Sequence, residues 1–439
     1  MATFSFAFSG DDIEGSENGG NGSLASAQAP SAAQQTAAPA ASAFPVQGKP
    51  QLPPQRHDVQ DMLARLPSKI AFSLLDVRLD DEAGGNSAGG GTASSPGTVL
   101  LHLPRRELWD VKVQLMAEED TDADADAEAN ADHEQRGQRS GGNELAPGLG
   151  THDVKTGIYE GGFKSWESSV DLVKALLQPS AAGTSSVAAP SAVAAAVLLQ
   201  DGPARVIELG CGTALPSLAL FHWACATAPH SHPLSITVAD YNPGVLYLVT
   251  LPNFLLAWAL QMRATSPLLQ QAVSVEQDEG HGDVHGEVEL TDDVKAAFVA
   301  FLDAASISLT FVSGGWSPAF IDLLYAVEDD AAGADAGAQA RSTTAVAHTL
   351  VLGAETIYSP FALEAFSETL LAILRREPSH NQARQGSVAT AVIGAKKLYF
   401  GVGGSLDDFI DRMRAAGATV RALREETDGV RRGVVQCLL

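Results

Sequence analysis

A glycine turn that directly follows a predicted strand constrains the fold of this chain more than any other feature. Residues 205–214 read R-V-I-E-L-G-C-G-T-A, so a short apolar strand leads into Gly210-Cys211-Gly212 and then into a helical stretch. Glycine lacks a Cβ and adopts positive φ easily, so a ligand can approach the backbone closely at such a turn. In α/β sheets, a turn of this kind receives a nucleotide-like ligand. Taken alone, the pattern fits an ordinary strand, turn and helix equally well.

The residues around the turn distinguish two cofactors. A dinucleotide-binding fingerprint requires a third glycine three residues after the second one, and Leu215 stands there instead. The acid inside the motif, Glu208, and the missing glycine suit a ligand with a cationic amino-acid end and no phosphate. S-adenosylmethionine has this shape, so we expect it in preference to NAD.

Strand and helix signals alternate along the rest of the chain. Strands are predicted at 206–209, 236–239, 307–312, 349–353, 390–395 and 434–439, with helices at 251–260, 361–374 and 406–416. Alternation of this kind is typical of a largely parallel sheet covered by helices on both faces. We therefore predict an α/β fold with a Rossmann-like sheet.

Several tracts contain too few large apolar residues to offset the entropy lost on folding. We predict a mostly disordered N-terminal region at 1–60, a β-rich extension at 61–116, and an acidic disordered insert at 117–150. The main domain is predicted at 151–439, with low-complexity inserts near 178–200, 274–293 and 329–345.

The extension carries β-like patterns. Residues 70–79 and 99–103 read as strands, and Val111, Val113 and Leu115 alternate with other residues. We expect a small hairpin or β-rich leader here. The acidic insert 274–291 is expected to loop out of the main domain.

The charge of the chain bears on its partners. The formal net charge is −25, and much of it comes from residues 118–134. Phosphate binding needs a basic stripe, and the basic residues are scattered, so we expect no direct nucleic-acid ligand. Acidic surfaces attract basic proteins, although acidic tracts that only keep the chain soluble explain the charge equally well.

Metal binding, membrane insertion and export are not expected. The three cysteines have no metal-ligand spacing, and His281 and His285 lie among glycines that oppose a helix. The apolar patch 192–199 is far shorter than the roughly 20 residues of a membrane span. No lysine or arginine precedes Lys49, so a secretory or mitochondrial leader is not indicated. We expect the protein in the cytoplasm and nucleus.

The predicted strands end in residues that suit a ligand site at the carboxyl edge of the sheet. Asp240 can bind both ribose hydroxyls, and Tyr241 and Asn242 are placed to flank an adenine, with Asn242 also suited to cap the next helix. Gly315 lets the adenine reach the backbone, and Trp316 covers a face or packs in the core. Glu355 to Tyr358 leaves the fourth strand toward the reacting groups, unless the carboxylate only caps the following helix.

A set of longer motifs extends this pattern. They are T-F-S-F-A-F, L-P-R-R-E-L-W-D-V-K-V-Q-L-M, G-I-Y-E-G-G-F-K-S-W-E, V-I-E-L-G-C-G-T, A-D-Y-N, V-T-L-P-N, G-G-W, A-E-T-I-Y-S-P and A-K-K-L-Y-F-G-V-G-G. With them, residues 70–439, inserts aside, resemble the protein-histidine methyltransferases of the seven-strand S-adenosylmethionine-dependent class. The chain departs from the family in its long inserts and in Ala214, where such motifs often have glycine.

The resemblance implies a cofactor, a substrate and a set of site residues. It implies S-adenosylmethionine as cofactor and one histidine of a large-subunit ribosomal protein, a basic partner, as the methyl acceptor. The cofactor pocket is implied at Trp166, Glu167, Gly210, Gly212, Ala239, Asp240, Tyr241, Asn242, Gly315, Trp316 and Ala354.

The chemistry of imidazole indicates how such a site works. A neutral histidine already has a nitrogen lone pair, so the enzyme has to supply alignment and the correct tautomer. We hypothesise that Glu355, or Asn242 from the other side, accepts the N–H of the nitrogen that is not methylated. Tyr358 and Tyr399 would line the slot for the imidazole.

Two other functions remain open from the sequence. Lysine methyltransferases of the same seven-strand group carry an acid-x-x-tyrosine motif after the fourth strand, as Glu355 to Tyr358 does here. A lysine must lose a proton before it attacks, so its pocket needs desolvation or an acid. The other alternative is a catalytically silent module that binds the cofactor and escorts a basic protein.

Overall fold

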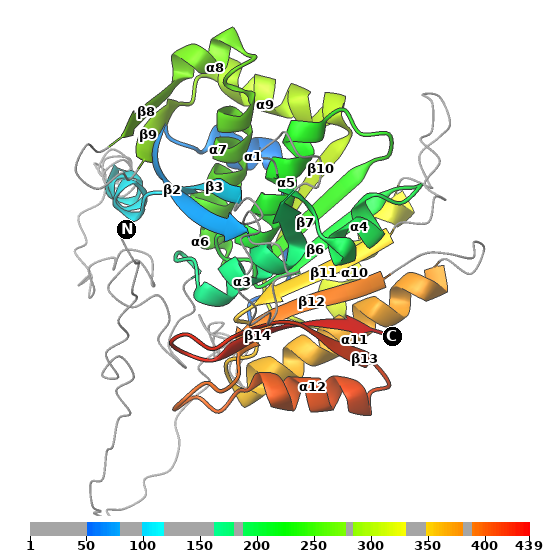
Figure 1. The fold of residues 1–439 in the computed structure, drawn as a ribbon. Coiled ribbons are helices and arrows are strands. Elements are labelled where there is room, and N and C mark those ends of the chain that lie inside the picture. The colour runs from blue at the N-terminus through cyan, green and yellow to red at the C-terminus, as the bar shows by residue number, and fades with distance from the viewer. Residues whose placement is uncertain are drawn as a thin grey trace, which may run out of the picture.

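An eight-stranded mixed sheet forms the centre of the molecule (Figure 1). The computed structural model describes residues 51–79, 99–117, 162–179, 188–277, 284–330, 348–380 and 389–439. In spatial order the strands are β1 (Gln55–His57), β10 (Ile307–Ser313), β7 (Leu234–Asp240), β6 (Ala204–Leu209), β11 (His348–Ala354), β12 (Ala389–Lys396), β14 (Arg432–Leu438) and β13 (Thr419–Glu426). The five strands from β10 to β12 run parallel, so the predicted α/β class is confirmed.

The sheet has one strand more than the seven predicted. The additional strand, β1, pairs antiparallel with β10 at the edge. We predicted no strand at β13, an edge strand in which no residue is buried and which therefore lacks an apolar pattern. Strand β14 lies between β12 and β13 and is antiparallel to both.

Helices cover both faces of the sheet (Figure 1). The helices α3 (Glu167–Leu176), α5 (Leu215–Thr227), α7 (Leu251–Met262) and α9 (Asp292–Ala305) pack into one core cluster. The helices α10 (Pro318–Asp330), α11 (Pro360–His380) and α12 (Leu406–Ala415) pack into the other. Neighbouring residues of one strand enter opposite clusters, as with Val206 and Ile207, because side chains alternate along a strand.

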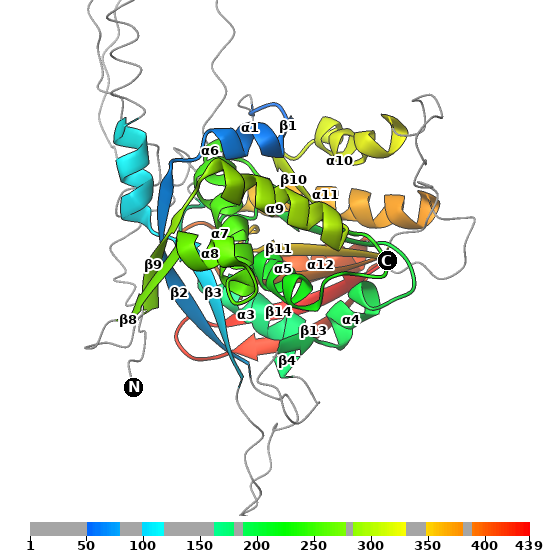
Figure 2. The ribbon, with the colours of Figure 1, turned by 90° about the horizontal axis from the view of Figure 1, so that it is seen from above.

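The acidic insert contributes to a second sheet, so the prediction that it loops out is wrong for its described parts. Its strands are β8 (Val273–Gln277) and β9 (Val284–Glu289), in a sheet ordered β3-β2-β9-β8 with β2 (Lys69–Leu79) and β3 (Val99–Arg106) (Figure 2). Val288 is fully buried, and Lys69 pairs with Glu287 across the strands at 2.9 Å. We did not predict these strands because acidic residues dominate the insert and make the alternation of buried and exposed positions inconspicuous in the sequence.

Residues 108–117 form a helix, so the strand predicted from Val111, Val113 and Leu115 is wrong. Val111 is fully buried whereas Val113 is 53% exposed, which two residues on one face of a strand would not show. Leu108, Val111 and Leu115 instead lie on one face of the helix at spacings of three and four. The sequence pattern was ambiguous because Val111 and Leu115, four residues apart, lie on one face in a strand and also in a helix.

Two stretches that we predicted as low in structure contain short helices and strands among their described residues. A short helix, α1 (Val59–Ala64), follows β1 and is capped by Asp58. Near 178–200, the strands β4 (Leu177–Pro179) and β5 (Ala188–Pro190) pair, and α4 (Ala192–Leu198) follows. The sequence pattern missed these elements because they are three to seven residues long.

One continuous helical stretch leads from the carboxyl edge into the core. It consists of α6 (Pro243–Val245), a π-helical turn η2 (Leu246–Thr250) and α7. Among the described residues it is long and apolar enough to cross a membrane by length and composition, but 83% of the span lies buried inside the protein. Such burial is typical of a core helix.

Candidate active site

The glycine turn after β6 is enclosed by two other loops. Gly210 and Gly212 have φ values of 64° and 51°, which favour glycine. A Cβ at Gly210 would lie 2.7 Å from Cγ2 of Thr356, in the loop after β11. A Cβ at Gly212 would lie 3.0 Å from the carbonyl oxygen of Gly162, which precedes α3. The two glycines therefore allow three loops to meet at one point of the carboxyl edge.

Asp240, at the end of β7, fixes the shape of this turn. Its carboxylate accepts hydrogen bonds from Gly212 N at 2.8 Å and from Asn242 N at 3.0 Å. The side chain is mostly buried. An ionised carboxylate has about four lone-pair positions, so Asp240 can still accept hydroxyl groups of a ligand.

Glu208 lies beneath the turn and caps α5. The residue before the helix is Ala214, which has no side-chain oxygen, and Glu208 Oε2 accepts the hydrogen bond from Ser217 N at 2.9 Å instead. Burial raises the pKa of Glu208 to about 7, against the opposing effect of its hydrogen bonds with Ser217. Burial also raises the pKa of the Cys211 thiol well above its usual value. The thiol therefore stays protonated.

Residues 51–54 cover the loop after β10. The sequence pattern had indicated no role for them. Leu52 O accepts a hydrogen bond from Gly315 N at 2.8 Å, and Leu52 N donates to the Tyr241 hydroxyl at 3.1 Å. A Cβ at Gly315 would lie only 2.2 Å from Oε1 of Gln51. Residues 51–54 thus lie over the place predicted for an adenine. In the sequence, the only signal for this segment is the short run Q-L-P-P, which directly precedes β1.

Trp316 fits both interpretations made from the sequence. Its ring packs edge-on against Phe366, with centroids 5.5 Å apart, as a core tryptophan would. It also borders the glycine turn, because Cζ2 lies 3.6 Å from the Cβ position of Gly210.

A carboxylate held by two hydroxyl groups lies at the end of β11. Ser168 Oγ donates to Oε1 of Glu355, and the Tyr399 hydroxyl also hydrogen bonds to this carboxylate. Burial, and then the charge of Glu355, raise the pKa of Tyr399 well above its usual value, so its hydroxyl stays a donor. The backbone of Glu355 is left-handed, with φ 58°, and its N–H donates to Gly394 O at 3.0 Å.

Lys396 lies near the rings of both Tyr399 and Trp166, the residue before α3. Its Nζ lies 5.1 Å from the centre of the Trp166 ring and 5.6 Å from that of Tyr399. We call Trp166, Ser168, Glu355, Lys396 and Tyr399 the acceptor cluster. Ser168 and Lys396 were missed by sequence reasoning. The motif G-I-Y-E-G-G-F-K-S-W-E ends directly before Ser168, and A-K-K-L-Y-F-G-V-G-G contains Lys396, but no spacing links residues 187 positions apart, as Ser168 and Glu355 are.

The other predicted site residues lie at the same edge but have structural partners. Glu167 pairs with Arg432 at 3.1 Å, and Asn242 Oδ1 caps α6 by accepting from Gly244 N at 2.9 Å. Tyr358 is half-buried and its carbonyl oxygen accepts from Gly404 N. Ala239 is the next-to-last residue of β7, and Ala354 is the last residue of β11. The structure therefore brings the predicted residues together, while their roles stay predictions.

The residues at this edge fit a small polar ligand that lies across the turn. Thr356 is buried, and its Oγ1 has no hydrogen-bond partner within the described ranges. Because an unpaired buried hydroxyl is unfavourable, a ligand group that bonds to it would be stabilising. Together with the Asp240 carboxylate, this hydroxyl suits the polar groups of S-adenosylmethionine. In the part of the chain that the structure describes, no three His, Cys, Asp or Glu side chains are grouped to hold a metal.

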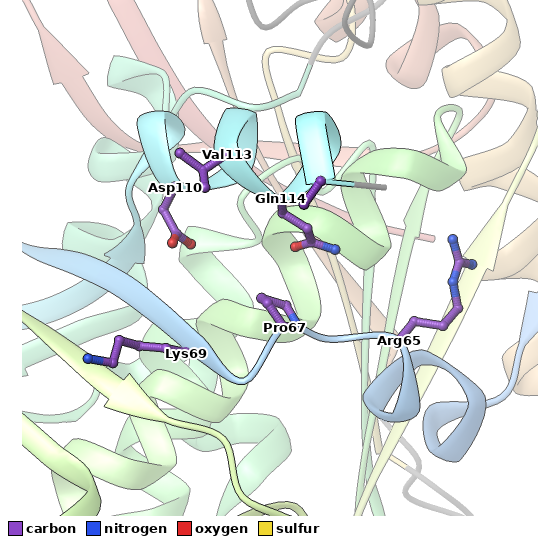
Figure 3. Close-up of a pocket in the computed structure, with 7 residues that line it drawn as sticks. Arg65, Pro67, Lys69, Asp110, Val113 and Gln114 are labelled. Atoms are coloured by element: carbon purple, nitrogen blue, oxygen red, sulfur yellow. The ribbon is translucent and has the colours of Figure 1, made fainter. Parts of the chain in front are cut away.

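A pocket elsewhere in the molecule contains none of the predicted site residues (Figure 3). It has a volume of about 340 Å³ and is lined by Arg65, Pro67, Lys69, Asp110, Val113, Gln114 and Ala117. It lies between the helix 108–117 and the segment after α1. Gln114 donates to the Tyr247 hydroxyl, which donates to Arg65 O at 2.6 Å, so these contacts hold the two sides together.

Comparisons with known proteins add an independent line of evidence. The chain is 35% identical over 310 residues to "Histidine protein methyltransferase 1" of Saccharomyces cerevisiae, covering 70% of this chain and 67% of that protein. It is 28% identical over 336 residues to the Schizosaccharomyces pombe protein of the same name, covering 75% of each. A Rattus norvegicus homologue is 24% identical over 298 residues, covering 67% of this chain and 62% of the homologue.

Two further comparisons are less informative. No protein-family model matches the chain. Among solved structures, the rRNA methyltransferase aviRa from Streptomyces viridochromogenes has 16% identity and a TM-score of 0.24, over 62% of this chain and 94% of that one. This TM-score is too low to support an argument.

Proposed function

The chain belongs to the family of histidine protein methyltransferases, and from this premise we propose that it methylates one histidine of a large-subunit ribosomal protein. Family membership confirms the resemblance seen in the sequence motifs and identifies the protein as a methyltransferase enzyme that acts on protein. The cofactor, the ribosomal substrate and the role of each residue belong to the proposal.

The observation that carries the proposal is the Glu355 carboxylate at the end of β11. Neutral imidazole has one N–H and one nitrogen with a lone pair. When Glu355 accepts the N–H, the other nitrogen is fixed as the nucleophile, and the carboxylate stabilises the positive charge that develops on the ring. A strong base is unnecessary, so the main requirement is alignment.

The acceptor cluster is built to keep this carboxylate in place. The hydroxyls of Ser168 and Tyr399 hold it from α3 and from the loop after β12. The left-handed backbone of Glu355 stores strain of order 1–3 kcal/mol, which proteins tend to retain at functional sites. The strain and the two donors together support a functional role over simple helix capping.

The glycine turn and its neighbours would hold the cofactor. Gly210 and Gly212 allow close approach, Asp240 would bind the ribose hydroxyls, and Thr356 offers its unpaired hydroxyl. When bound, S-adenosylmethionine would supply the methyl group from its sulfonium: the N–C bond to the imidazole would form as the C–S bond breaks, and the thioether S-adenosylhomocysteine would leave. Trp166, which precedes α3 and contacts Lys396, would exclude water from the acceptor cluster.

The negative net charge of the chain supports a basic substrate, and its free cysteines support a reducing compartment. A ribosomal protein is basic, and this chain carries a formal net charge of −25. The free cysteines Cys211, Cys225 and Cys437 are buried, as suits a reducing compartment. We infer that the protein acts in the cytoplasm and nucleus, where ribosomal proteins are made and assembled.

Steady-state kinetics of Glu355→Gln and Glu355→Ala test the assigned role. Glutamine still accepts an N–H but lacks the charge, so we expect kcat to fall about 10²-fold, and further in the alanine variant. Glu364→Gln on α11, which removes the charge from an exposed contact with Arg412 on α12, serves as the matched control and should leave kcat unchanged. Unchanged kcat in both Glu355 variants would contradict the role.

The product identifies the reaction. The purified protein is incubated with methyl-tritiated cofactor and large-subunit ribosomal proteins, and the labelled amino acid is identified after hydrolysis and located by mass spectrometry. Methylhistidine supports the proposal, and methyllysine supports the lysine alternative that Glu355 to Tyr358 raised. Calorimetry that detects a nicotinamide coenzyme but not S-adenosylmethionine or its demethylated product would overturn the cofactor assignment.

A further inference from the structure

The loop between β12 and α12 exposes apolar side chains next to the acceptor cluster. Tyr399 is buried and reaches Glu355, whereas Leu398 and Phe400, on either side of it, are 45% and 73% exposed. Phe400 is the most exposed large apolar residue in the described part of the chain. A phenylalanine exposed beside a reaction site can bury its ring against an apolar group of a bound partner.

The loop is held rigidly at its base. Tyr399 N donates to Gly404 O at 2.9 Å, Gly403 N donates to Tyr399 O at 3.1 Å, and Gly404 N donates to Tyr358 O at 3.1 Å. Gly401 and Gly403 have φ values of 78° and 90°, which the tight turn requires. The two apolar side chains are therefore presented in a fixed arrangement, which reduces the entropy lost when a partner binds.

A neighbouring turn extends the apolar surface. Lys397 N donates to Arg431 O at 2.8 Å, which ties the loop to the turn between β13 and β14. That turn carries Val430, which is 37% exposed. In Figure 1 the orange loop and the red turn project from the same side of the sheet. We call Leu398, Phe400 and Val430 the apolar rim.

Three basic residues around the apolar rim are paired with acids. Lys397 lies 3.5 Å from Asp407, Arg431 lies 3.0 Å from Glu425, and Arg432 lies 2.6 Å from Asp171. The rim therefore offers little net charge to a partner, and recognition there would depend on apolar contact.

We propose that the apolar rim binds an apolar side chain of the protein substrate close to the methylated histidine, and so contributes to substrate specificity. This inference rests on the proposed function. The substrate must place an imidazole against Glu355, so its polypeptide has to continue across the adjoining surface. Phe400 follows the residue whose hydroxyl reaches Glu355. A substrate segment that leaves the imidazole site on this side would therefore pass the loop that carries Phe400.

Kinetics of Phe400→Ser with large-subunit ribosomal proteins and S-adenosylmethionine test the inference. We expect KM for the protein substrate to rise at least 10-fold, while kcat and the affinity for the cofactor change less than twofold. The matched control is Leu199→Ser, because Leu199 is 59% exposed but lies after α4, ahead of the amino end of β6. A residue that only stabilised the fold would change the cofactor affinity and the unfolding midpoint as well.

Photo-crosslinking identifies the occupant directly. A benzoylphenylalanine replaces Phe400 in one sample and Leu199 in the other, and the crosslinked residues are mapped by mass spectrometry. We expect only the Phe400 position to crosslink, to an apolar residue within a few positions of the methylated histidine. Crosslinks to residues 1–50 or 118–161 of this chain, or to a second copy, would overturn the inference, as would an unchanged KM without crosslinks.

The outcomes also separate this inference from the proposed function. If the wild-type protein yields methylhistidine but Phe400→Ser behaves like the control, the function stands and the apolar rim is not a substrate contact. If no methylhistidine forms but the substrate protein crosslinks at the Phe400 position, the rim binds protein and the reaction assigned to the site is wrong.

Discussion

Left-handed backbone conformations occur at three described residues that are not glycine, and two of them border the candidate site. They are Ala214, Ser306 and Glu355, with φ values of 55°, 56° and 58°. Ser306 ends α9, where such a conformation is common. Ala214 starts α5 directly after the glycine turn, which explains why related motifs often have glycine there: a Cβ is unfavourable at this φ.

Replacing Ala214 by glycine should therefore stabilise the protein. Relief of the strained φ is partly offset by the entropy that glycine adds to the unfolded chain and by the loss of a fully buried methyl group, so we expect the free energy of unfolding to rise by about 0.5 kcal/mol or less in urea titrations. Ala219→Gly, in the interior of α5, is the control and should lower it by about 1 kcal/mol or more. A loss of the same size at both positions would contradict the prediction.

Glu208 makes the stability of the fold depend on pH. Its pKa rises from an ordinary 4.5 to about 7 in the folded protein. Between these values the folded state binds more protons than the unfolded state, so the contribution of this carboxyl to the free energy of unfolding decreases as the pH rises. Below pH 4.5 both states are protonated and the contribution no longer changes.

Glu208→Gln should remove this dependence, because glutamine can still accept the hydrogen bond from Ser217 N but does not titrate. Relative to wild type, we expect the variant's free energy of unfolding to increase by roughly 2–3 kcal/mol between about pH 5 and about pH 8. Urea denaturation at each pH measures it. The exposed Glu368→Gln is the control and should show a constant difference; a constant difference for Glu208→Gln would refute the assigned pKa.

At the scale of the elements, the sequence predicted strands well where they are buried on both faces. The central strands β6, β7 and β11 appear as apolar runs. The glycine turn directly follows β6 and Asp240 ends β7, so this half of the site could be predicted. Edge strands such as β13 have no such run. The contact of Ser168 with Glu355 joins α3 to β11, and only the packing of the sheet brings them together.

Two motifs that the sequence left without a role are linked to the turn by one side chain. Asn253, in V-T-L-P-N, is fully buried in α7. Its Oδ1 accepts from Arg106 N, in L-P-R-R-E-L-W, at 2.8 Å, and its Nδ2 donates to Thr213 O at 3.1 Å. Asn253 thus connects β3, α7 and the residue that follows Gly212.

Asn253→Ala should destabilise the protein strongly, since it leaves a buried N–H and a buried C=O without partners. At about 1–3 kcal/mol for each group, we expect the free energy of unfolding to fall by about 2–4 kcal/mol, together with weaker cofactor binding by calorimetry. The exposed Thr265→Ala is a control that should change stability by less than about 0.5 kcal/mol. If Asn253→Ala also changed the free energy of unfolding by less than about 0.5 kcal/mol, the hydrogen bonds of Asn253 would not contribute to stability.

At the scale of the whole molecule, charge and apolar contact act over different distances. Nine of the seventeen residues from 118 to 134 are acidic and none is Lys or Arg. Their field attracts a basic substrate over about a Debye length, roughly 10 Å at 0.1 M salt. The apolar rim acts only on contact, and its ion pairs leave it nearly neutral. Salt should therefore weaken the attraction by residues 118–134 and leave the contact at the apolar rim unchanged.

Deletion of residues 118–134 should lower kcat/KM for a basic ribosomal protein about 10-fold at about 50 mM salt, and less than twofold at about 300 mM, because only the electrostatic attraction is removed. The rise in KM expected for Phe400→Ser should be similar at both salt concentrations. Deletion of residues 24–40, seventeen residues without charge, controls for chain length. Identical salt profiles for wild type and the 118–134 deletion would show that the acidic tract does not attract the substrate. Loss of substrate binding at every salt concentration, with kcat unchanged, would instead make the tract a tight binding site for the basic protein.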